Sequence, residues 1–147
     1  MVGSALVGRT YAPYSATVEA GRLRLFAKAI GETRPEYVDE DAARAAGHPG
    51  LPAPPTFVAC LAMEVPDPFA WLREAEVDVA RMLHAAQGFR YFAPVHAGDR
   101  LTFAARIDRV TAKKGGTLTF IVRATEVTNQ HGARVAQVRT TVVVREA

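Results

Sequence analysis

The sequence lacks the features that mark a secreted or membrane-spanning protein. It has one cysteine, Cys60, so no disulfide can form within the chain, which fits a reducing compartment. No apolar run approaches the roughly 18 residues that a membrane helix needs, and residues 1–10 lack the charged and apolar regions of a signal peptide. We therefore expect a cytoplasmic protein without membrane attachment.

Metal-binding and nucleic-acid-binding patterns are also missing. His48, His96 and His131 lie in turn segments with no cysteine or carboxylate at ligand spacing, so we expect no metal site. Lysine and arginine are scattered and aromatic residues do not interleave with them, which argues against nucleic acid despite a net charge of +3. The mild positive excess fits an acidic partner, such as coenzyme A or a phosphopantetheine carrier.

What the chain does have is the composition of an ordinary globular domain. Its 147 residues are 49% hydrophobic and 22% charged, and this length is enough to bury a sizeable core. The sequence contains no internal repeat or low-complexity segment. We expect residues 1–147 to form a single domain.

The first half alternates short predicted elements with turn signals. Arg9–Val18 mixes β-branched and aromatic residues and predicts a strand. A helix is expected from Glu19 to Gly31, because apolar residues recur there at helical spacing and the glycine suits a left-handed C-terminal cap. Asp39 predicts the N-cap of a short helix over Glu40–Ala46.

A stiff connector and an apolar helix follow. Residues His48–Pro55 include four prolines, and Pro55 is expected in the first turn of the next helix. Thr56–Met63 is apolar on nearly every side, which is typical of a buried helix. Asp67–Leu83 predicts a connection that contains a short helix near Trp71.

The second half has the period of two that marks strands with one buried face. Turn signals at Gly98-Asp99, Gly115-Gly116 and Asn129–Gly132 separate these strands and predict an antiparallel meander. An apolar helix followed by a run of strands predicts an α+β protein whose curved antiparallel sheet wraps around a central buried helix. The predicted strands are Gly88–Pro94, Arg100–Val110, Thr117–Thr128 and Arg134–Arg145.

Two segments resemble signatures of a known family. GETRPEY, residues Gly31–Tyr37, is similar to the hydratase motif of the MaoC-type hotdog fold, in which Gly, Asp, two residues, Pro, one residue and His follow a helix. RYFAPVHAGDRL, at Arg90–Leu101, resembles the family's aromatic strand and its Pro-x-x-x-Gly-Asp turn. The likeness covers essentially the whole chain and implies a single hotdog domain. It is closest to the N-terminal MaoC-type dehydratase group, which includes non-catalytic partner subunits of (3R)-hydroxyacyl-ACP dehydratases.

The resemblance places Glu32 and Tyr37 at the catalytic positions, where the family has Asp and His. Hydration of an enoyl thioester needs proton transfer at C2, a group that handles water or hydroxyl at C3, and a donor for the enolate-like oxygen. Glu32 keeps a carboxylate, but a tyrosine phenol ionises at about pH 10 in water and is a poor base. Pro55 aligns with the glycine that donates its N–H in the family, and proline has no N–H. We therefore expect no hydratase activity from this chain alone.

The resemblance further implies a substrate and a partner. It assigns Pro55, Thr56, Phe57 and His84 to the substrate-binding cleft, for an acyl-CoA or acyl-carrier-protein thioester, and it implies no cofactor. A hotdog sheet leaves an open edge strand, so we expect either a homodimer or a heterodimer with a catalytic hotdog subunit.

Other interpretations stay open. Glu32 is also typical of a solvated loop, Tyr37 of a packing aromatic, and His84 of a structural or interfacial residue. A hotdog acyl thioesterase would use Glu64, beside the buried helix, to activate water. A third alternative is a module that binds acyl-CoA without chemistry.

Overall fold

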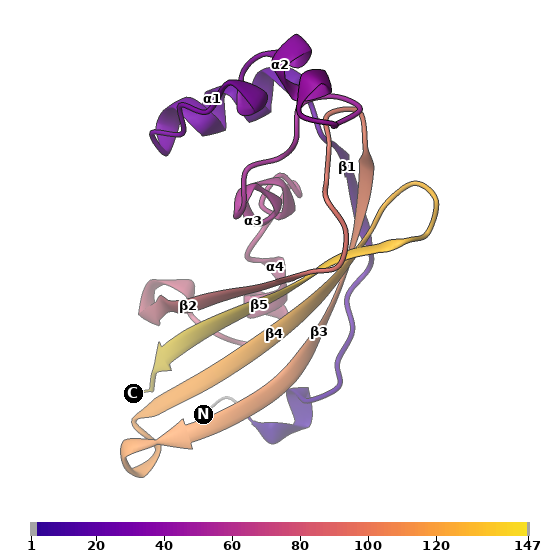
Figure 1. Ribbon diagram of the computed structural model, residues 1–147. Helices are drawn as coiled ribbons and strands as arrows, with labels where there is room; N and C mark the ends of the chain where they lie inside the picture. The colour runs from indigo at the N-terminus through magenta and orange to yellow at the C-terminus, as the bar shows by residue number, and fades with distance from the viewer. Residues whose placement is uncertain (1–2, 147) are drawn as a thin grey trace.

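The computed structural model describes residues 3–146, which form a twisted antiparallel sheet with short helices along it (Figure 1). The strands are β1 (Tyr14–Thr17), β2 (Met82–Tyr91), β3 (Arg100–Lys113), β4 (Leu118–Thr128) and β5 (Arg134–Arg145). The α-helices are α1 (Ala20–Ala29), α2 (Glu40–Ala45), α3 (Phe57–Ala62) and α4 (Ala70–Glu74). The strands lie side by side in the order β1-β3-β4-β5-β2. The predicted α+β class is confirmed.

The ends of α1 and α2 are set by residues that the sequence identifies. Gly31 follows α1 with a φ of 72°, a left-handed conformation that glycine adopts without steric penalty. The Asp39 side chain accepts a hydrogen bond of 2.7 Å from the Ala42 backbone N–H and caps α2. Leu23 and Ala27 are buried on the inner side of α1, as its apolar spacing predicts. These helices therefore fix both ends of the loop that carries the family motif.

The first strand is shorter than predicted. β1 covers four residues, whereas the sequence predicts a strand over Arg9–Val18. Pro13 has no N–H to donate to a strand ladder, and Thr10 before it makes only an isolated bridge to Arg106. The prediction is therefore confirmed only for the second half of that segment.

The meander is confirmed for β3, β4 and β5 but is wrong for β2. That strand pairs with β5 and not with β3, so the segment after β2 crosses to the opposite side of the sheet. β2 begins at Met82 rather than at the predicted Gly88, and a bulge between His84 and Ala86 interrupts its register. β2 is therefore an edge strand, and most of its side chains are exposed.

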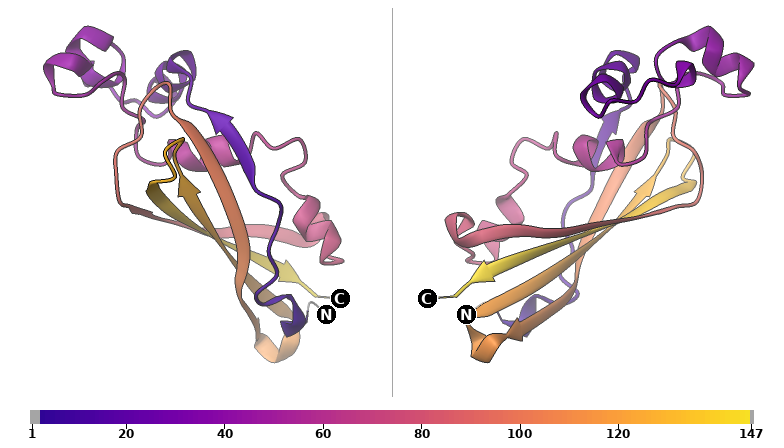
Figure 2. Two further views of the ribbon diagram at one scale, coloured as in Figure 1. Left: turned by 90° about the vertical axis from the view of Figure 1, so that its right-hand side faces the viewer. Right: turned by 60° about the vertical axis from the view of Figure 1, so that its left-hand side comes forward.

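Helices α1 and α2 lie toward one end of the sheet and α4 toward the other (Figure 2). Two hydrophobic clusters pack along the sheet, one toward each of these ends. The first joins α1, α2 and α3 to the strands and includes Leu23, Ala43, Phe57, Val58, Leu61, Leu101, Phe103 and Val127. The second joins α4, the short helix expected near Trp71, to the far halves of the strands and includes Trp71, Leu72, Ile107, Ile121 and Val142. The motif loop and the proline-rich connector both lie at the first cluster.

The helix expected over Thr56–Met63 is present as α3, and it packs against the sheet through Phe57, Val58 and Leu61. It is shorter than expected and exposes Cys60 and Met63 on its other side. Pro55 precedes the helix instead of lying in its first turn. None of the helices that residues 3–146 form is long and apolar enough to cross a membrane.

Candidate functional site

The motif loop holds Glu32 in an ion pair with Arg34. The guanidinium Nε and Nη2 donate to the two carboxylate oxygens at 3.1 and 2.8 Å, and the Arg34 backbone N–H donates to Oε1 at 3.0 Å. The side-chain hydrogen bonds from Arg34, followed by its backbone N–H, lower the pKa of Glu32 to about 2. Glu32 is thus an ionised carboxylate whose oxygens are already bound within its own loop.

Tyr37 lies beside the same arginine. It ends the 3-10 turn Pro35–Tyr37, and the Arg34 guanidinium carbon lies 4.8 Å from the centre of its ring, within cation–π range. Arg34 therefore contacts both residues at the family's catalytic positions. Tyr37 also lines a pocket, whereas Glu32 is not among the residues that line it.

That pocket, of about 290 Å³, lies between the proline-rich connector and the end of β2. Two backbone contacts tie these segments together: the Ala53 N–H donates to Val95 O at 2.8 Å, and Pro52 forms a bridge with His96. The walls are mostly apolar, and the polar tips come from two tyrosines and one histidine. The lining residues are Tyr37, His48, Pro52, Ala53, Pro54, Pro55, Val58, Tyr91, Phe92, Ala93, Pro94 and Val95.

The backbone is strained at the edge of this pocket. Thr56 has φ 80° and ψ −16°, a left-handed conformation that is a genuine outlier for a β-branched residue. Its backbone N–H donates a hydrogen bond of 3.0 Å to the Tyr91 hydroxyl. Such strain costs of order 1–3 kcal/mol and persists where the surrounding structure fixes it, often at ligand sites.

Two histidines, His48 of the pocket lining and His96, lie in contact. His48 Nδ1 lies 3.1 Å from His96 Nε2, so the two rings share a hydrogen bond. Burial lowers the pKa of His96, and the neighbouring His48 adds to that effect while Asp99 opposes it. Residues 3–146 contain no group of three or more potential ligands close enough to hold a metal ion.

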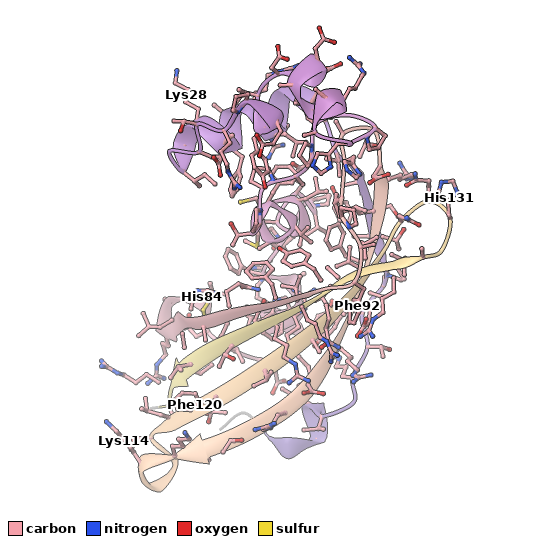
Figure 3. The ribbon with its side chains drawn as sticks, viewed as in Figure 1. Lys28, His84, Phe92, Lys114, Phe120 and His131 are labelled. Atoms are coloured by element: carbon pink, nitrogen blue, oxygen red, sulfur yellow. The ribbon has the colours of Figure 1, made fainter. Side chains whose placement is uncertain are left out.

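The other predicted site residues lie apart from the pocket or inside the core. Phe57 is buried, with its ring 5.4 Å from that of Phe26 in an edge-to-face contact. His84 lies near the start of β2, whereas Phe92 follows its end (Figure 3). The His84 side chain is exposed, and its Nε2 lies 3.0 Å from Gln87 Oε1. The structure therefore brings Tyr37, Pro55 and the Thr56 N–H to one place, and leaves Glu32 and His84 outside it.

Sequence reasoning assigned no role to Tyr91 or to the contact between His48 and His96. Tyr91 lies in the aromatic segment that resembles the family, and that resemblance is the only sequence signal that points to this residue. The thioesterase candidate Glu64 follows α3 and forms an ion pair with Arg22 of α1, and it does not line the pocket.

Comparisons with known proteins agree with this architecture. The family described as FAS1-like, dehydratase domain region, matches residues 5–138. A UPF0336 protein of Streptomyces coelicolor is 38% identical over 144 residues, which cover 97% of this chain and 94% of that protein. The crystal structure of the C-terminally truncated HadBC (3R-hydroxyacyl-ACP dehydratase) complex from Mycobacterium tuberculosis contains a chain that is 31% identical, with a TM-score of 0.81, covering 94% of this chain and 96% of that one.

A second solved structure shows the likeness of fold alone. The MaoC-like dehydratase from Rhodospirillum rubrum is 22% identical, with a TM-score of 0.71, and the match covers 96% of this chain and 93% of that one. The predicted hotdog fold is thereby confirmed.

Proposed function

We propose a function for this chain on the premise that it belongs to the MaoC-like hotdog dehydratase family. Its membership is shown by the match to the family described as FAS1-like, dehydratase domain region. In this proposal the chain is a thioester-binding subunit of a (3R)-hydroxyacyl-thioester dehydratase or enoyl hydratase. It binds the acyl group, and a partner subunit with the intact Asp and His performs the proton transfers. The observation that carries the proposal is Glu32, whose carboxylate is bound by Arg34 at the family's acidic catalytic position.

The chemistry of the motif supports the need for a partner. A carboxylate that accepts hydrogen bonds from one guanidinium at both oxygens has a low affinity for a proton and is therefore a poor base. Tyr37 offers a phenol where the reaction needs a base, and Pro55 offers no N–H for the enolate-like oxygen. An intact Asp–His pair from another subunit restores the missing step.

The shape of the chain supports the nature of that partner. β2 is an edge strand, and it displays exposed side chains that include Leu83, which is 70% exposed. Pairing of this edge with a second hotdog sheet would satisfy its open backbone groups and cover these side chains. The related HadBC structure is itself a complex of a (3R)-hydroxyacyl-ACP dehydratase, which supports a hotdog partner for this chain.

The proposal is tested by reconstitution. The purified chain is mixed with a MaoC-type subunit that carries the intact Asp and His, taken from the neighbouring reading frame where one is present. Complex formation is measured by light scattering and turnover by hydration of crotonyl-CoA and longer enoyl-CoA thioesters. We expect no turnover from the chain alone, and a stable complex whose chain-length preference differs from that of the partner by itself.

Two exposed leucines provide a matched pair of variants. Leu83→Asp places a charge on the β2 edge and should prevent the complex, whereas Leu25→Asp places it on α1, where Leu25 is 63% exposed, and should leave the complex intact. Hydration by the chain alone that disappears in Glu32→Gln or Tyr37→Phe would overturn the proposal. So would the absence of both a complex and any change in chain-length preference.

A further inference from the structure

Tyr91 has one hydrogen-bonding group that the protein leaves unused. Its phenol oxygen accepts the Thr56 backbone N–H at 3.0 Å, and a hydroxyl that accepts one hydrogen bond still has its own O–H to donate. Within residues 3–146, that O–H donates to no protein acceptor. Tyr91 also lines the pocket, so this donor is available to a bound molecule.

The surroundings hold the Tyr91 ring in place. The ring is stacked on Phe89, with the two planes 2° apart and the centroids 6.0 Å apart. Its hydroxyl is fixed from the other side by Thr56, whose strained conformation aims the N–H at the phenol oxygen. The connector in turn is tied to the segment after β2, since the Ala97 N–H donates to Leu51 O at 2.8 Å. A donor held in this way loses little freedom when a ligand binds.

The pocket lining indicates what kind of acceptor fits. None of the lining residues is Lys, Arg, Asp or Glu, so no permanently charged side chain lines the pocket to pair with a carboxylate or a phosphate. Its walls are prolines, alanines, valines and Phe92, which suit an acyl group. A neutral carbonyl oxygen next to an apolar chain matches one hydroxyl donor in an apolar pocket. A hydroxyl that already accepts an N–H is also polarised and donates more strongly.

We infer that the Tyr91 hydroxyl is the hydrogen-bond donor to the carbonyl oxygen of a bound acyl thioester, with the Thr56 N–H behind it. This inference rests on the proposed function, because it assumes that the ligand is a thioester. In this arrangement Tyr91 supplies the donor that Pro55 lacks. Thr56 positions the hydroxyl and does not touch the ligand itself.

The inference is tested by binding and by vibrational spectroscopy on the full chain. Butyryl-CoA labelled with ¹³C at its carbonyl is bound to the wild type, and the carbonyl stretch is measured by isotope-edited infrared difference spectroscopy. We expect Tyr91→Phe to weaken binding roughly threefold to tenfold and to move the stretch to higher frequency, because the carbonyl loses a donor. Tyr14→Phe removes a hydroxyl outside the pocket lining and should change neither quantity.

Different outcomes separate this inference from the function on which it rests. If the wild type fails to bind the thioester, alone and with its partner, the proposed function and this inference both fall. If binding occurs but Tyr91→Phe leaves the affinity and the stretch unchanged, only this inference falls. The same holds if Tyr37→Phe, and not Tyr91→Phe, moves the stretch.

A second measurement covers the case in which Tyr91→Phe does not fold. The chain is produced with 3-fluorotyrosine, whose more acidic phenol donates a stronger hydrogen bond. We expect the carbonyl stretch of the bound thioester to move to lower frequency than in the unlabelled protein. An unchanged frequency contradicts the assignment of a tyrosine donor.

Discussion

The motif loop and the proline-rich connector differ in how they satisfy their polar groups. In the loop, Glu32 and Arg34 bind each other through both carboxylate oxygens, with the Arg34 side chain exposed and that of Glu32 largely covered. Directly after the connector, Thr56 holds a strained backbone and donates its N–H to the hydroxyl of Tyr91, which lines an apolar pocket. The loop resembles the family's sequence pattern, whereas the pocket beside the connector contains a hydroxyl whose own O–H donates to no acceptor within residues 3–146.

This difference teaches that a segment resembling a family motif and a pocket with an unused hydrogen-bond donor need not coincide. An ion pair between two residues of one loop stabilises the conformation of that loop, but it leaves the carboxylate with a low affinity for a proton. Backbone strain such as that at Thr56, by contrast, clusters at active sites and ligand-binding sites. Residues that match a motif are therefore weaker guides to chemistry than residues whose hydrogen bonds remain incomplete.

The largest effect should come from removing the support of the connector. Phe57 is 1% exposed and packs against Phe26, so Phe57→Ala should lower the free energy of unfolding by about 3–5 kcal/mol. Urea unfolding measures this loss. Phe92→Ala, at a residue that is 41% exposed, is the matched control and should lose less than half as much. Equal losses would mean that α3 does not anchor the connector more firmly than the end of β2.

An intermediate effect of opposite sign should come from relieving the strain. Glycine adopts positive φ freely, so Thr56→Gly should raise the free energy of unfolding by about 1 kcal/mol, the relief of strain exceeding the entropy that glycine adds to the unfolded chain. Thermal unfolding at fixed concentration measures the change. Thr117 has φ −74°, so Thr117→Gly relieves no strain and should destabilise. A loss of stability in Thr56→Gly would show that the positive φ of Thr56 does not destabilise the folded protein, so that strain would not distinguish the two segments.

The smallest effect on stability should come from the motif loop. The pKa of Glu32 is lowered to about 2 in the folded protein, below the ordinary value of 4.5. The folded state thus binds fewer protons than the unfolded state in this range, so the ion pair contributes stability above about pH 4.5 that is lost as the pH falls toward 2. Because the Arg34 side chain is 59% exposed and solvent screens the pair from that side, the contribution is small.

Carbon NMR of the Glu32 carboxyl measures its titration directly. Arg34→Gln should return the pKa of Glu32 toward its ordinary value, whereas Lys28→Gln, which removes a charge on α1 instead, should leave it low. A pKa of Glu32 that stays near 2 in Arg34→Gln would show that another group holds the carboxylate. The motif loop, like the connector, would then depend on contacts with residues outside its own segment.

Much of the fold could be predicted because its signals are local. Gly31 and Asp39 set helix ends through their own conformation and side chain, and the alternation in β3, β4 and β5 reports one buried face. The pairing of β2 with β5 could not be predicted in this way. This pairing depends on the path of the connection between β2 and β3. A period of two in the sequence identifies a strand but not the strand that pairs with it.

The site was less predictable for the same reason. The ion pair between Glu32 and Arg34 joins residues two positions apart, and the sequence placed them side by side. The bond from Thr56 to Tyr91 spans 35 positions and that between His48 and His96 spans 48, so only the folded chain reveals them. The positive φ of Thr56 also runs against its residue type, because tertiary contacts there override local preference.

The edge strand β2 has a consequence for how the protein must be made. It contains no lysine and no proline, so only the bulge between His84 and Ala86 and the charge of Arg90 discourage stray pairing along this edge. In the proposed complex the partner subunit covers β2. Chain produced in excess over the partner therefore leaves β2 open, and further copies can pair with it irregularly. In that complex, the yield of monodisperse protein should follow the ratio at which the chain and its proposed partner are produced, and not the expression level of either one.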